Sequence, residues 1–327
     1  EESQFRDLER FAVHPEQHLA VTGSDQGHVN LWNLQTRSLL DQIRFKSPVA
    51  IKTLQWLSAD KLFVASALSS GEGGGAYILN LQPNDDQSFT LVVTKEIWDG
   101  NVDAATVYVD PPQSTEQSAD NSPQLTGRVV LATKSTDPQT SPASGISTLH
   151  FLDLQTGNRL QQFKIDTEIY SLGFDSDGTK LAVGTDHELL LYTVSTTENP
   201  GWKQDQRFAF TRDLAQNKRA IKSVLFWQPN STPFILSAGH DNRIRAWNLN
   251  TGQQEFELMG HQSMVQSISL DATSGRLASA SNDRIIIVWD LDQRKIVTTF
   301  DEHQREVTQV RLLENGRKLL SVSWDGR

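Results

Sequence analysis

The sequence predicts an all-β fold in which sheets of four antiparallel strands follow one another along the chain. A pattern of about 40 residues recurs through the sequence, which is typical of repeat architectures. Within each copy, apolar and polar residues alternate over short runs rich in Val, Ile, Leu and aromatic residues, and this is the period of a strand. Turn pairs such as Asp177–Gly178 and Asn315–Gly316 separate the runs. One such sheet cannot bury both of its faces, so we expect the sheets to pack as blades around a channel.

The copies are clearest in the second half of the chain. The reference copy is "GHQSMVQSISLDATSGRLASASNDRIIIVWDLD" (Gly260–Asp292). Three other stretches follow the same pattern: Ala220–Gly252, Glu168–Val194 and Glu9–Thr36. A fourth stretch, Glu306–Arg327, begins the pattern and stops early, and weaker copies lie in the first half, in the region from Val49 to Ile165.

Each copy supplies four strands. A large aromatic or aliphatic residue lies near the end of the third run, and a further strand-like run such as "KIVTTFD" follows it. These anchor residues lie about 40 to 70 residues apart, because loop insertions lengthen some copies. The anchors are Trp32, Leu79, Leu152, Tyr192, Trp247 and Trp289.

The stretch "LASASNDRIIIVWD" (Leu277–Asp290) is specific, because spacing and residue type agree with a known pattern at many positions at once. It resembles the repeat of the WD-repeat β-propeller family. The resemblance covers nearly the whole chain; it is strong over Lys218–Arg327 and weak over Val49–Ile165. It implies a rigid platform for other proteins.

Counting the copies gives six full units and the first half of another. The simplest interpretation is a seven-bladed β-propeller of four-stranded antiparallel blades, with the last blade incomplete in this chain. We expect its remaining strands to lie beyond Arg327, or residues Glu1–Asp7 to add one strand to it. A complete six-bladed ring with a partial extra unit is the alternative. In either case residues 1–327 form a single repeat domain.

The resemblance implies one hydrogen-bonded chain of side chains within the reference copy, formed by His261, Ser279, Asp283 and Trp289. A buried indole N–H needs an acceptor, and a serine hydroxyl can accept from it while donating to a histidine. The aspartate can accept from the other ring nitrogen and from backbone N–H groups of the turn. We expect this quartet to stabilise the blade rather than to react with a substrate.

Other copies keep only parts of the quartet. The fifth and seventh copies keep three members each, and the first keeps the tryptophan with Thr22 but has Gln26 at the aspartate position. The fourth copy has Asp186 in the turn, Ala182 at the hydroxyl position and Tyr192 as anchor. The further members of this structural network are Ser237, Asp241 and Trp247 in the fifth copy, His303, Ser321 and Asp325 in the seventh, and Trp32 in the first.

Two insertions rich in Ser, Thr, Pro and Gln interrupt the third copy, at about residues 110–127 and 134–145. Their composition is typical of surface loops. We expect them to be tolerated insertions at loop tips. The alternative is that one of them is a regulatory or partner-binding loop.

Composition excludes several classes of protein. The chain of 327 residues has no cysteine, so it has neither disulfides nor thiolate metal sites. Its formal net charge of −10 argues against general nucleic-acid binding. No apolar run reaches the ~18 residues of a membrane span, and no signal-peptide pattern is present at the start. We expect a cytoplasmic protein without a membrane span.

No motif predicts a cofactor, a metal ion or catalysis. The pair of histidines in "HPEQH" (His14–His18) lacks the helical setting of a zinc motif. The "DSDG" turn (Asp175–Gly178) lacks the distal ligands of a calcium loop. "GEGGG" (Gly71–Gly75) lacks the Lys-Ser/Thr of a phosphate loop. His261 is explained by its structural partners, so we expect the chain not to be an enzyme.

The residues beside the turn aspartates should face a partner. In the family, loops at one end of the blades form the binding platform, and preorganised loops keep the ordering cost of binding low. Trp324 is the most informative residue, because a large aromatic there has no obvious core contact and aromatic residues often anchor interfaces. The candidate partner-binding residues are Trp324, His240, Asn282, Met264 and Arg305.

Three functions remain open from the sequence. The favoured one is a non-catalytic interaction scaffold or recognition module that binds a protein or peptide, as part of a larger protein or complex and with other domains fused to it in the parent protein. The second is a fixed subunit of a trafficking, RNA-processing or ubiquitin-ligase assembly. The third is a propeller enzyme or small-ligand binder that uses the central channel, which would need several carboxylates or histidines converging at the channel mouth.

Overall fold

The structure is a computed structural model in which β-strands account for almost all regular secondary structure. The described residues contain six antiparallel sheets of four strands and one antiparallel sheet of two strands. The predicted all-β fold of four-stranded antiparallel blades is therefore confirmed. The residues that the structure describes are 8–45, 49–68, 74–85, 88–111, 125–134, 145–195, 201–209 and 220–326. The predictions for Glu1–Asp7 and for most of both insertions lie outside these ranges.

The chain forms two compact units. The N-terminal unit is Phe11–Asp166, and the C-terminal unit is Thr167–Arg327 together with Glu1–Arg10. Each unit is described by itself below.

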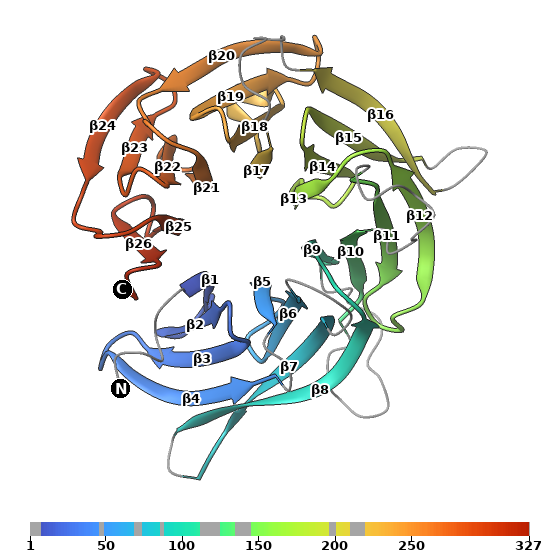
Figure 1. The fold of residues 1–327 in the computed structure, drawn as a ribbon, viewed down its shortest axis with the longest axis vertical. Coiled ribbons are helices and arrows are strands. Elements are labelled where there is room, and N and C mark those ends of the chain that lie inside the picture. Colours follow the sequence, from blue (N-terminus) through green and yellow to red (C-terminus); the bar gives the residue numbers. More distant parts are fainter. Residues whose placement is uncertain are drawn as a thin grey trace. The chain divides into compact units, whose positions relative to one another are not determined.

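Three four-stranded sheets span the N-terminal unit, and in each of them the strands lie in chain order (Figure 1). The first sheet is β1 (Leu8–Val13), β2 (Leu19–Ser24), β3 (His28–Asn33) and β4 (Ser38–Arg44), of which the start of β1 falls in the other unit. The second is β5 (Ala50–Trp56), β6 (Lys61–Ala67), β7 (Gly75–Pro83) and β8 (Phe89–Asp99). The third is β9 (Ala104–Val109), β10 (Gly127–Lys134), β11 (Ser147–Asp153) and β12 (Arg159–Ile165).

The core of this unit lies between neighbouring sheets. The second strand of each sheet reads as an apolar run and is almost fully buried, because both of its faces are covered. Val21 and Leu31 pack with Leu62 of the next sheet in one apolar cluster. Phe63 and Leu131 belong to a second cluster, between the second and third sheets.

A buried histidine lies between the second and third sheets. The His150 ring on β11 is 4.5 Å from the Trp98 ring, and its Nε2 is 3.1 Å from Thr133 Oγ1. Among the described residues its Nδ1 has no hydrogen-bond partner. Burial, with a smaller contribution from Arg159, lowers the pKa of His150 from 6.5 to about 4. The ring is therefore neutral in the folded protein.

We expect acid to destabilise the fold through His150. Because the folded pKa is depressed, this contribution to stability is complete above pH 6.5 and is lost as the pH falls toward 4. The shift corresponds to about 3 kcal/mol at most, and to about 1–2 kcal/mol after allowance for partial solvent access. Urea unfolding at pH 7.5 and 4.5 should show a larger loss for the wild type than for His150→Gln. Equal losses would contradict this role.

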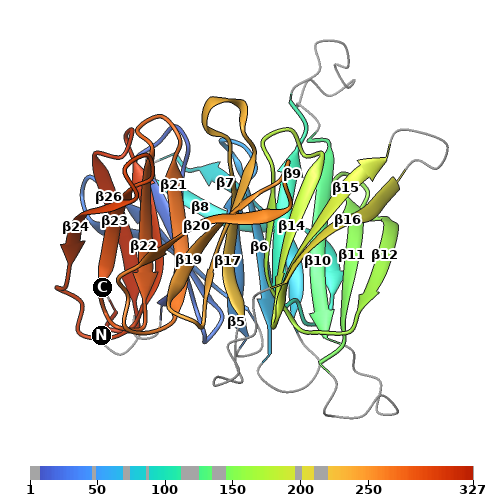
Figure 2. The ribbon, with the colours of Figure 1, turned by 90° about the horizontal axis from the view of Figure 1, so that it is seen from above.

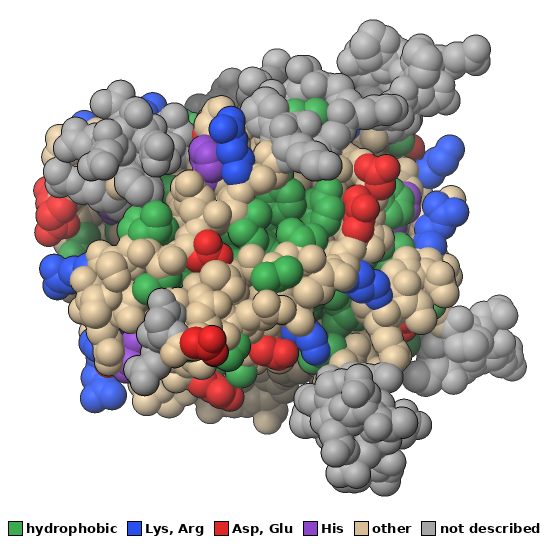
Figure 3. Space-filling view, turned by 90° about the horizontal axis from the view of Figure 1, so that it is seen from below, with side chains coloured by type: hydrophobic (Ala, Val, Ile, Leu, Met, Phe, Trp, Pro, Cys, Tyr) green, Lys and Arg blue, Asp and Glu red, His purple; other side chains and the backbone are tan. Residues whose placement is uncertain are grey.

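The outer strands of the first two sheets carry exposed apolar side chains. Leu91 N on β8 donates to Asp41 Oδ2 on β4 at 2.7 Å, so the two strands lie side by side. Leu39, Val92 and Val93 on these strands are at least one third exposed. Apolar side chains gather on the face on which these strands lie (Figure 3).

The C-terminal unit holds three further four-stranded sheets and the two-stranded one. The first is β13 (Ile169–Phe174), β14 (Lys180–Thr185), β15 (Glu188–Ser195) and β16 (Gly201–Ala209). The second is β17 (Ile221–Trp227), the short 3-10 turn η2 (Pro229–Ser231), β18 (Phe234–Gly239), β19 (Arg243–Asn248) and β20 (Gln253–Met259). The third is β21 (Val265–Asp271), β22 (Arg276–Ser281), β23 (Ile286–Asp290) and β24 (Lys295–Phe300), and the last is β25 (Val307–Leu313) and β26 (Lys318–Ser323).

Neighbouring sheets of this unit stand side by side (Figure 2). Their innermost strands are linked by hydrogen bonds to serine side chains. Ile268 N on β21 donates to Ser223 Oγ on β17 at 3.2 Å, and Leu312 N on β25 donates to Ser269 Oγ on β21 at 3.0 Å. The strands β17, β21 and β25 therefore lie next to one another.

The first strand of each of these sheets contains a β-bulge near its start. The pairing of β21 with β22 skips Gln266, and the equivalent strands skip Tyr170, Lys222 and Thr308. A bulge inserts one residue without a partner and redirects its side chain. Two of these side chains meet, because Lys222 Nζ lies 4.1 Å from the centre of the Tyr170 ring.

The last sheet has only two strands among the described residues. Thr308 on β25 donates from Oγ1 to the carbonyl oxygen of Leu8 at 2.9 Å. The structure thus gives six complete blades and a partial seventh sheet, and the count of seven blades stays a prediction.

One assignment in the fourth copy was wrong by a residue. Leu181 pairs with the anchor Tyr192 as Leu277 pairs with Trp289, so the hydroxyl position is Val183 and not Ala182. The turn after β14 is one residue shorter than the turn after β22. Asp186 is therefore the residue that follows Thr185, and does not occupy the position of the reference aspartate.

Candidate protein interface

The reference quartet lies in one hydrogen-bonded chain across the sheet β21–β24. His261 Nδ1 is 2.9 Å from Asp283 Oδ2, and its Nε2 is 2.7 Å from Ser279 Oγ. Trp289 Nε1 donates to the same Ser279 oxygen at 2.8 Å. Ser279 and Trp289 are buried, and the His261 side chain is only 1% exposed. The chain ties the segment before β21 to β22 and β23.

The proton positions follow from the partners. If His261 carries its proton on Nδ1, it donates to Asp283 and accepts from Ser279 at Nε2, and the Ser279 oxygen then accepts the Trp289 N–H. Asp283 also accepts from the backbone N–H groups of Gln262 at 2.8 Å and Ile285 at 2.9 Å. Burial would raise the pKa of Asp283, but the hydrogen bonds from His261 and the two backbone groups lower it below the ordinary value. The arrangement therefore holds an ionised carboxylate in a fixed turn.

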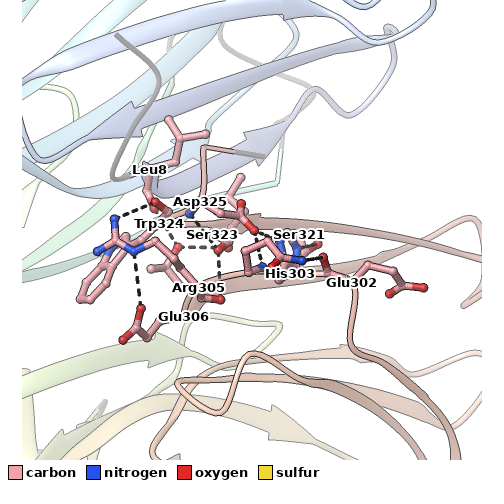
Figure 4. Close-up of polar contacts among 12 residues, drawn as sticks. Leu8, Glu302, His303, Arg305, Glu306, Ser321, Ser323, Trp324 and Asp325 are labelled. Carbon is pink, nitrogen blue, oxygen red and sulfur yellow. Dashed lines mark hydrogen bonds and ion pairs between the residues drawn. The ribbon is translucent and has the colours of Figure 1, made fainter. Parts of the chain in front are cut away.

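The seventh copy repeats three members of this chain. His303 Nδ1 is 2.9 Å from Asp325 Oδ2, and His303 Nε2 is 2.9 Å from Ser321 Oγ (Figure 4). Gln304 N donates to Asp325 at 2.9 Å, as Gln262 does in the reference copy.

The fifth copy keeps the tryptophan bond and replaces the histidine. Trp247 Nε1 donates to Ser237 Oγ at 2.8 Å. No Gly-His pair precedes this copy, and Asp241 forms an ion pair with Arg245 on β19 instead. In the first copy Trp32 Nε1 donates to Thr22 Oγ1 at 2.9 Å.

A second hydroxyl group, two residues before the turn aspartate, was missed by the sequence analysis. Ser281 accepts from Asp283 N at 3.1 Å and donates to the carbonyl of Ser263 at 3.0 Å. Ser323 makes the same two bonds in the seventh copy. The sequence does indicate this hydroxyl group, because the equivalent positions of three other copies hold Ser24, Ser66 and Thr185.

Three candidate partner-binding residues occupy equivalent positions at the same end of neighbouring sheets. The backbone N–H of His240 donates to Ala220 O, that of Asn282 to Met264 O, and that of Trp324 to Glu306 O, at 3.0 to 3.1 Å. We call this end of the C-terminal unit the turn end; it comprises the turns after β18, β22 and β26 and the segments before β17, β21 and β25. Asn282 Oδ1 also accepts from Gln266 Nε2 at 2.8 Å.

Trp324 and Arg305 form a pair at the turn end (Figure 4). The Arg305 guanidinium carbon lies 5.8 Å from the centre of the Trp324 ring, and Arg305 donates to the Trp324 carbonyl at 3.1 Å. Arg305 is exposed and Trp324 is half-buried. Among the described residues, the buried Trp324 Nε1 has no hydrogen-bond partner. The pair offers an aromatic ring and a cation close to one another.

Neither a metal site nor a membrane helix is found in the described part of the chain. No three His, Asp or Glu side chains gather there in a metal-binding arrangement. No helix there is long and apolar enough to cross a membrane.

Comparison with known families identifies the repeat. Residues 252–290 and 294–327 match the family described as WD domain, G-beta repeat. These stretches contain β20–β23 and β24–β26, where the quartet geometry is most complete. These two stretches are therefore WD repeats, as the sequence resemblance implied.

Curated relatives match parts of the chain. Eukaryotic translation initiation factor 3 subunit I of Neurospora crassa is 30% identical over 110 residues, which are 34% of this chain and 31% of that protein. Coronin-2A of Bos taurus is 27% identical over 129 residues, 36% of this chain and 24% of that protein. Ribosome biogenesis protein ytm1 of Aspergillus niger is 38% identical over 78 residues, 21% of this chain and 15% of that protein. The chain thus spans less than a third of the length of these relatives.

Proposed function

We propose that this chain is a non-catalytic protein-interaction module that binds a protein or peptide at the turn end of its C-terminal unit. The observation that carries the proposal is the pair of Trp324 and Arg305. Tryptophan and arginine are the residue types that most often dominate binding energy at protein interfaces. The half-buried Trp324 ring and the exposed Arg305 guanidinium lie beside each other, so a partner can contact both at once.

The rigidity of the turn end supports the proposal. Hydrogen bonds of Asp283 and Asp325 fix the turns on which Asn282 and Trp324 lie. A surface that is already ordered loses little conformational entropy on binding, so more of the contact energy appears as affinity.

A second candidate is a fixed subunit of a larger assembly, such as a trafficking, RNA-processing or ubiquitin-ligase complex. One relative is named as a subunit of a translation initiation factor, and another as a ribosome biogenesis protein. We propose this role as the alternative, because those names describe parts of multi-component processes. A fixed subunit would co-purify in constant ratio with the same partners, whereas a recognition module would exchange them.

Trp324→Ala should abolish partner capture and leave the fold intact. Affinity purification of the tagged 327-residue chain, followed by mass spectrometry, gives the partners of the wild type. Loss of the same proteins from the Trp324→Ala sample, with a melting temperature within about 2 °C of the wild type, supports the interface. Arg305→Ala should weaken capture as well, because it removes the neighbouring cation.

Gln293→Ala is the matched control, because Gln293 is exposed in the turn between β23 and β24, at the other end of its sheet. Capture should be unchanged in this variant. Retained capture by Trp324→Ala, or a large fall in its melting temperature, would assign Trp324 to the fold instead.

We also propose the finer features expected from the sequence. The chain is a single repeat domain with seven blades, because six copies and the start of a seventh follow one pattern. One urea-induced transition, observed alike by tryptophan fluorescence and circular dichroism, would support a single domain. Location in the cytoplasm, other domains in the parent protein and the absence of general nucleic-acid binding remain predictions.

A further inference from the structure

The turn between β25 and β26 contains the one Asn-Gly pair of the sequence, Asn315–Gly316. The turn runs from Glu314 to Arg317, whose backbone N–H donates to the Glu314 carbonyl at 3.3 Å. Asn315 and Gly316 have φ angles of 56° and 73°, as the two central residues of a type I′ turn do. This turn lies at the end of the last sheet that is opposite to the turn end, so it is no part of the proposed interface.

The two groups of this pair that can react with each other are both free. Asn315 is exposed, and neither its side-chain amide nor the Gly316 N–H forms a hydrogen bond with another described residue. Gly316 has no side chain that would shield its nitrogen. Asn250, in the turn after β19, is equally exposed but differs in this respect. The residue after it is the β-branched Thr251, whose N–H donates to Asn248 Oδ1 at 3.3 Å.

A positive charge lies beside the Asn-Gly pair. Arg317 Nε donates to the Glu314 carbonyl at 3.1 Å, which holds the guanidinium against the turn. The Glu314 carboxylate is paired with Lys318 Nζ at 2.5 Å. A nearby cation favours the ionised form of a group that becomes negative when it loses its proton. The Gly316 nitrogen must lose its proton to attack a carbonyl, so Arg317 favours that attack.

We propose that Asn315 is a site of spontaneous deamidation in the folded protein. The deprotonated Gly316 nitrogen attacks Cγ of Asn315, the new N–Cγ bond forms, the Cγ–Nδ2 bond breaks, and ammonia leaves with the proton that Gly316 lost. The resulting succinimide takes up one water molecule. Cleavage of the N–Cγ bond gives aspartate, whereas cleavage of the original peptide bond gives isoaspartate, in which the main chain runs through the side-chain carbons.

The two products should affect the last sheet differently. Each adds one negative charge to the formal −10 of the chain. Isoaspartate also lengthens the main chain of the turn by one carbon. Gly316 lies so close to the sheet β21–β24 that a Cβ built on it would be 2.5 Å from Ser274 Oγ and 3.4 Å from Arg276 Cδ. We therefore expect isoaspartate to loosen this contact and aspartate to leave it in place.

Incubation of the 327-residue chain in heavy-oxygen water, followed by peptide mapping with mass spectrometry, tests the site. Asn315 should convert at least about tenfold faster than Asn250 in the same sample, with heavy oxygen in both products. The heavy oxygen separates this conversion from any that occurs during digestion. Equal rates at the two residues would overturn the proposal. Conversion of Asn315 in urea but not in the folded chain would overturn it as well, because the turn would then protect the amide.

Two variants test the assignment and its consequence. Asn315→Gly removes the amide and suits the positive φ of this position, so it should lack the main acidic form that the wild type accumulates on ion exchange. Persistence of that form would place the modification elsewhere. Asn315→Asp should melt within about 2 °C of the wild type, and the purified isoaspartyl form should melt lower by more than that. An isoaspartyl form that melts like the wild type would overturn the proposed effect on the last sheet.

Discussion

Trp289→Ala will lower the free energy of unfolding by about 3–5 kcal/mol. Trp289 is 2% exposed and packs in an apolar cluster with residues of the neighbouring sheet, among them Leu236 and Leu258. The substitution leaves a cavity between two sheets, because neither backbone can close onto an alanine. It also removes the N–H that Ser279 accepts. The shift of the urea midpoint, with an unchanged slope, measures the loss.

Trp289→Phe separates packing from hydrogen bonding. It keeps most of the ring and loses the indole N–H, so the loss should be nearer to about 1–2 kcal/mol. Equal losses in the two variants would mean that the Ser279 bond, and not the filled volume, is the main contribution. A loss below about 1 kcal/mol for Trp289→Ala would contradict its place in the core.

Asp283→Ala is expected to cost about 2–4 kcal/mol. The carboxylate accepts from His261 and from two backbone N–H groups, and its side chain is only 7% exposed. Its removal leaves the His261 and backbone N–H donors without the carboxylate acceptor, in a site that is largely inaccessible to water. Because the pKa of Asp283 is lowered in the folded state, its contribution is present above the ordinary aspartate pKa and is lost as the pH falls below it. Urea unfolding at pH 7 measures the cost.

Asp241→Ala is the matched control for Asp283→Ala. Asp241 occupies the same turn position in the fifth copy, but its side chain is 26% exposed and its partner is Arg245. An ion pair with this exposure contributes about 1 kcal/mol or less. Equal losses of unfolding free energy in the two variants would show that the network with His261 stabilises the fold no more than the exposed ion pair does.

The repeat pattern could be predicted from the sequence because it depends on local features. Strand alternation and turn residues located the strands of the second half, and the sheet β21–β24 follows the stretch from Val265 to Phe300 closely. The family resemblance then supplied the roles of His261 and Ser279, whose hydrogen bonds the spacing alone does not specify. In the fourth copy the turn is one residue shorter, and Asp186 looked like the reference aspartate although it stands one position earlier.

Other features depend on contacts between sheets and could not be read from one copy. His150 and Trp98 lie 52 positions apart in the sequence, and only the packing of two sheets brings their rings together. The second hydroxyl of the turn was overlooked because serine is common in turns for several reasons. Comparison of all copies at that one position would have separated Ser281 from ordinary turn serines.

The bulges near the starts of β13, β17, β21 and β25 leave residues that take no part in strand pairing. Strand pairing passes over Tyr170, Lys222 and Gln266, so their identity is not dictated by the ladder around them. In three successive copies, the side chain at the bulge position is a phenol, an ammonium and an amide. We expect mutation at these positions to change the side-chain chemistry of this end of the sheets while strand pairing stays constant.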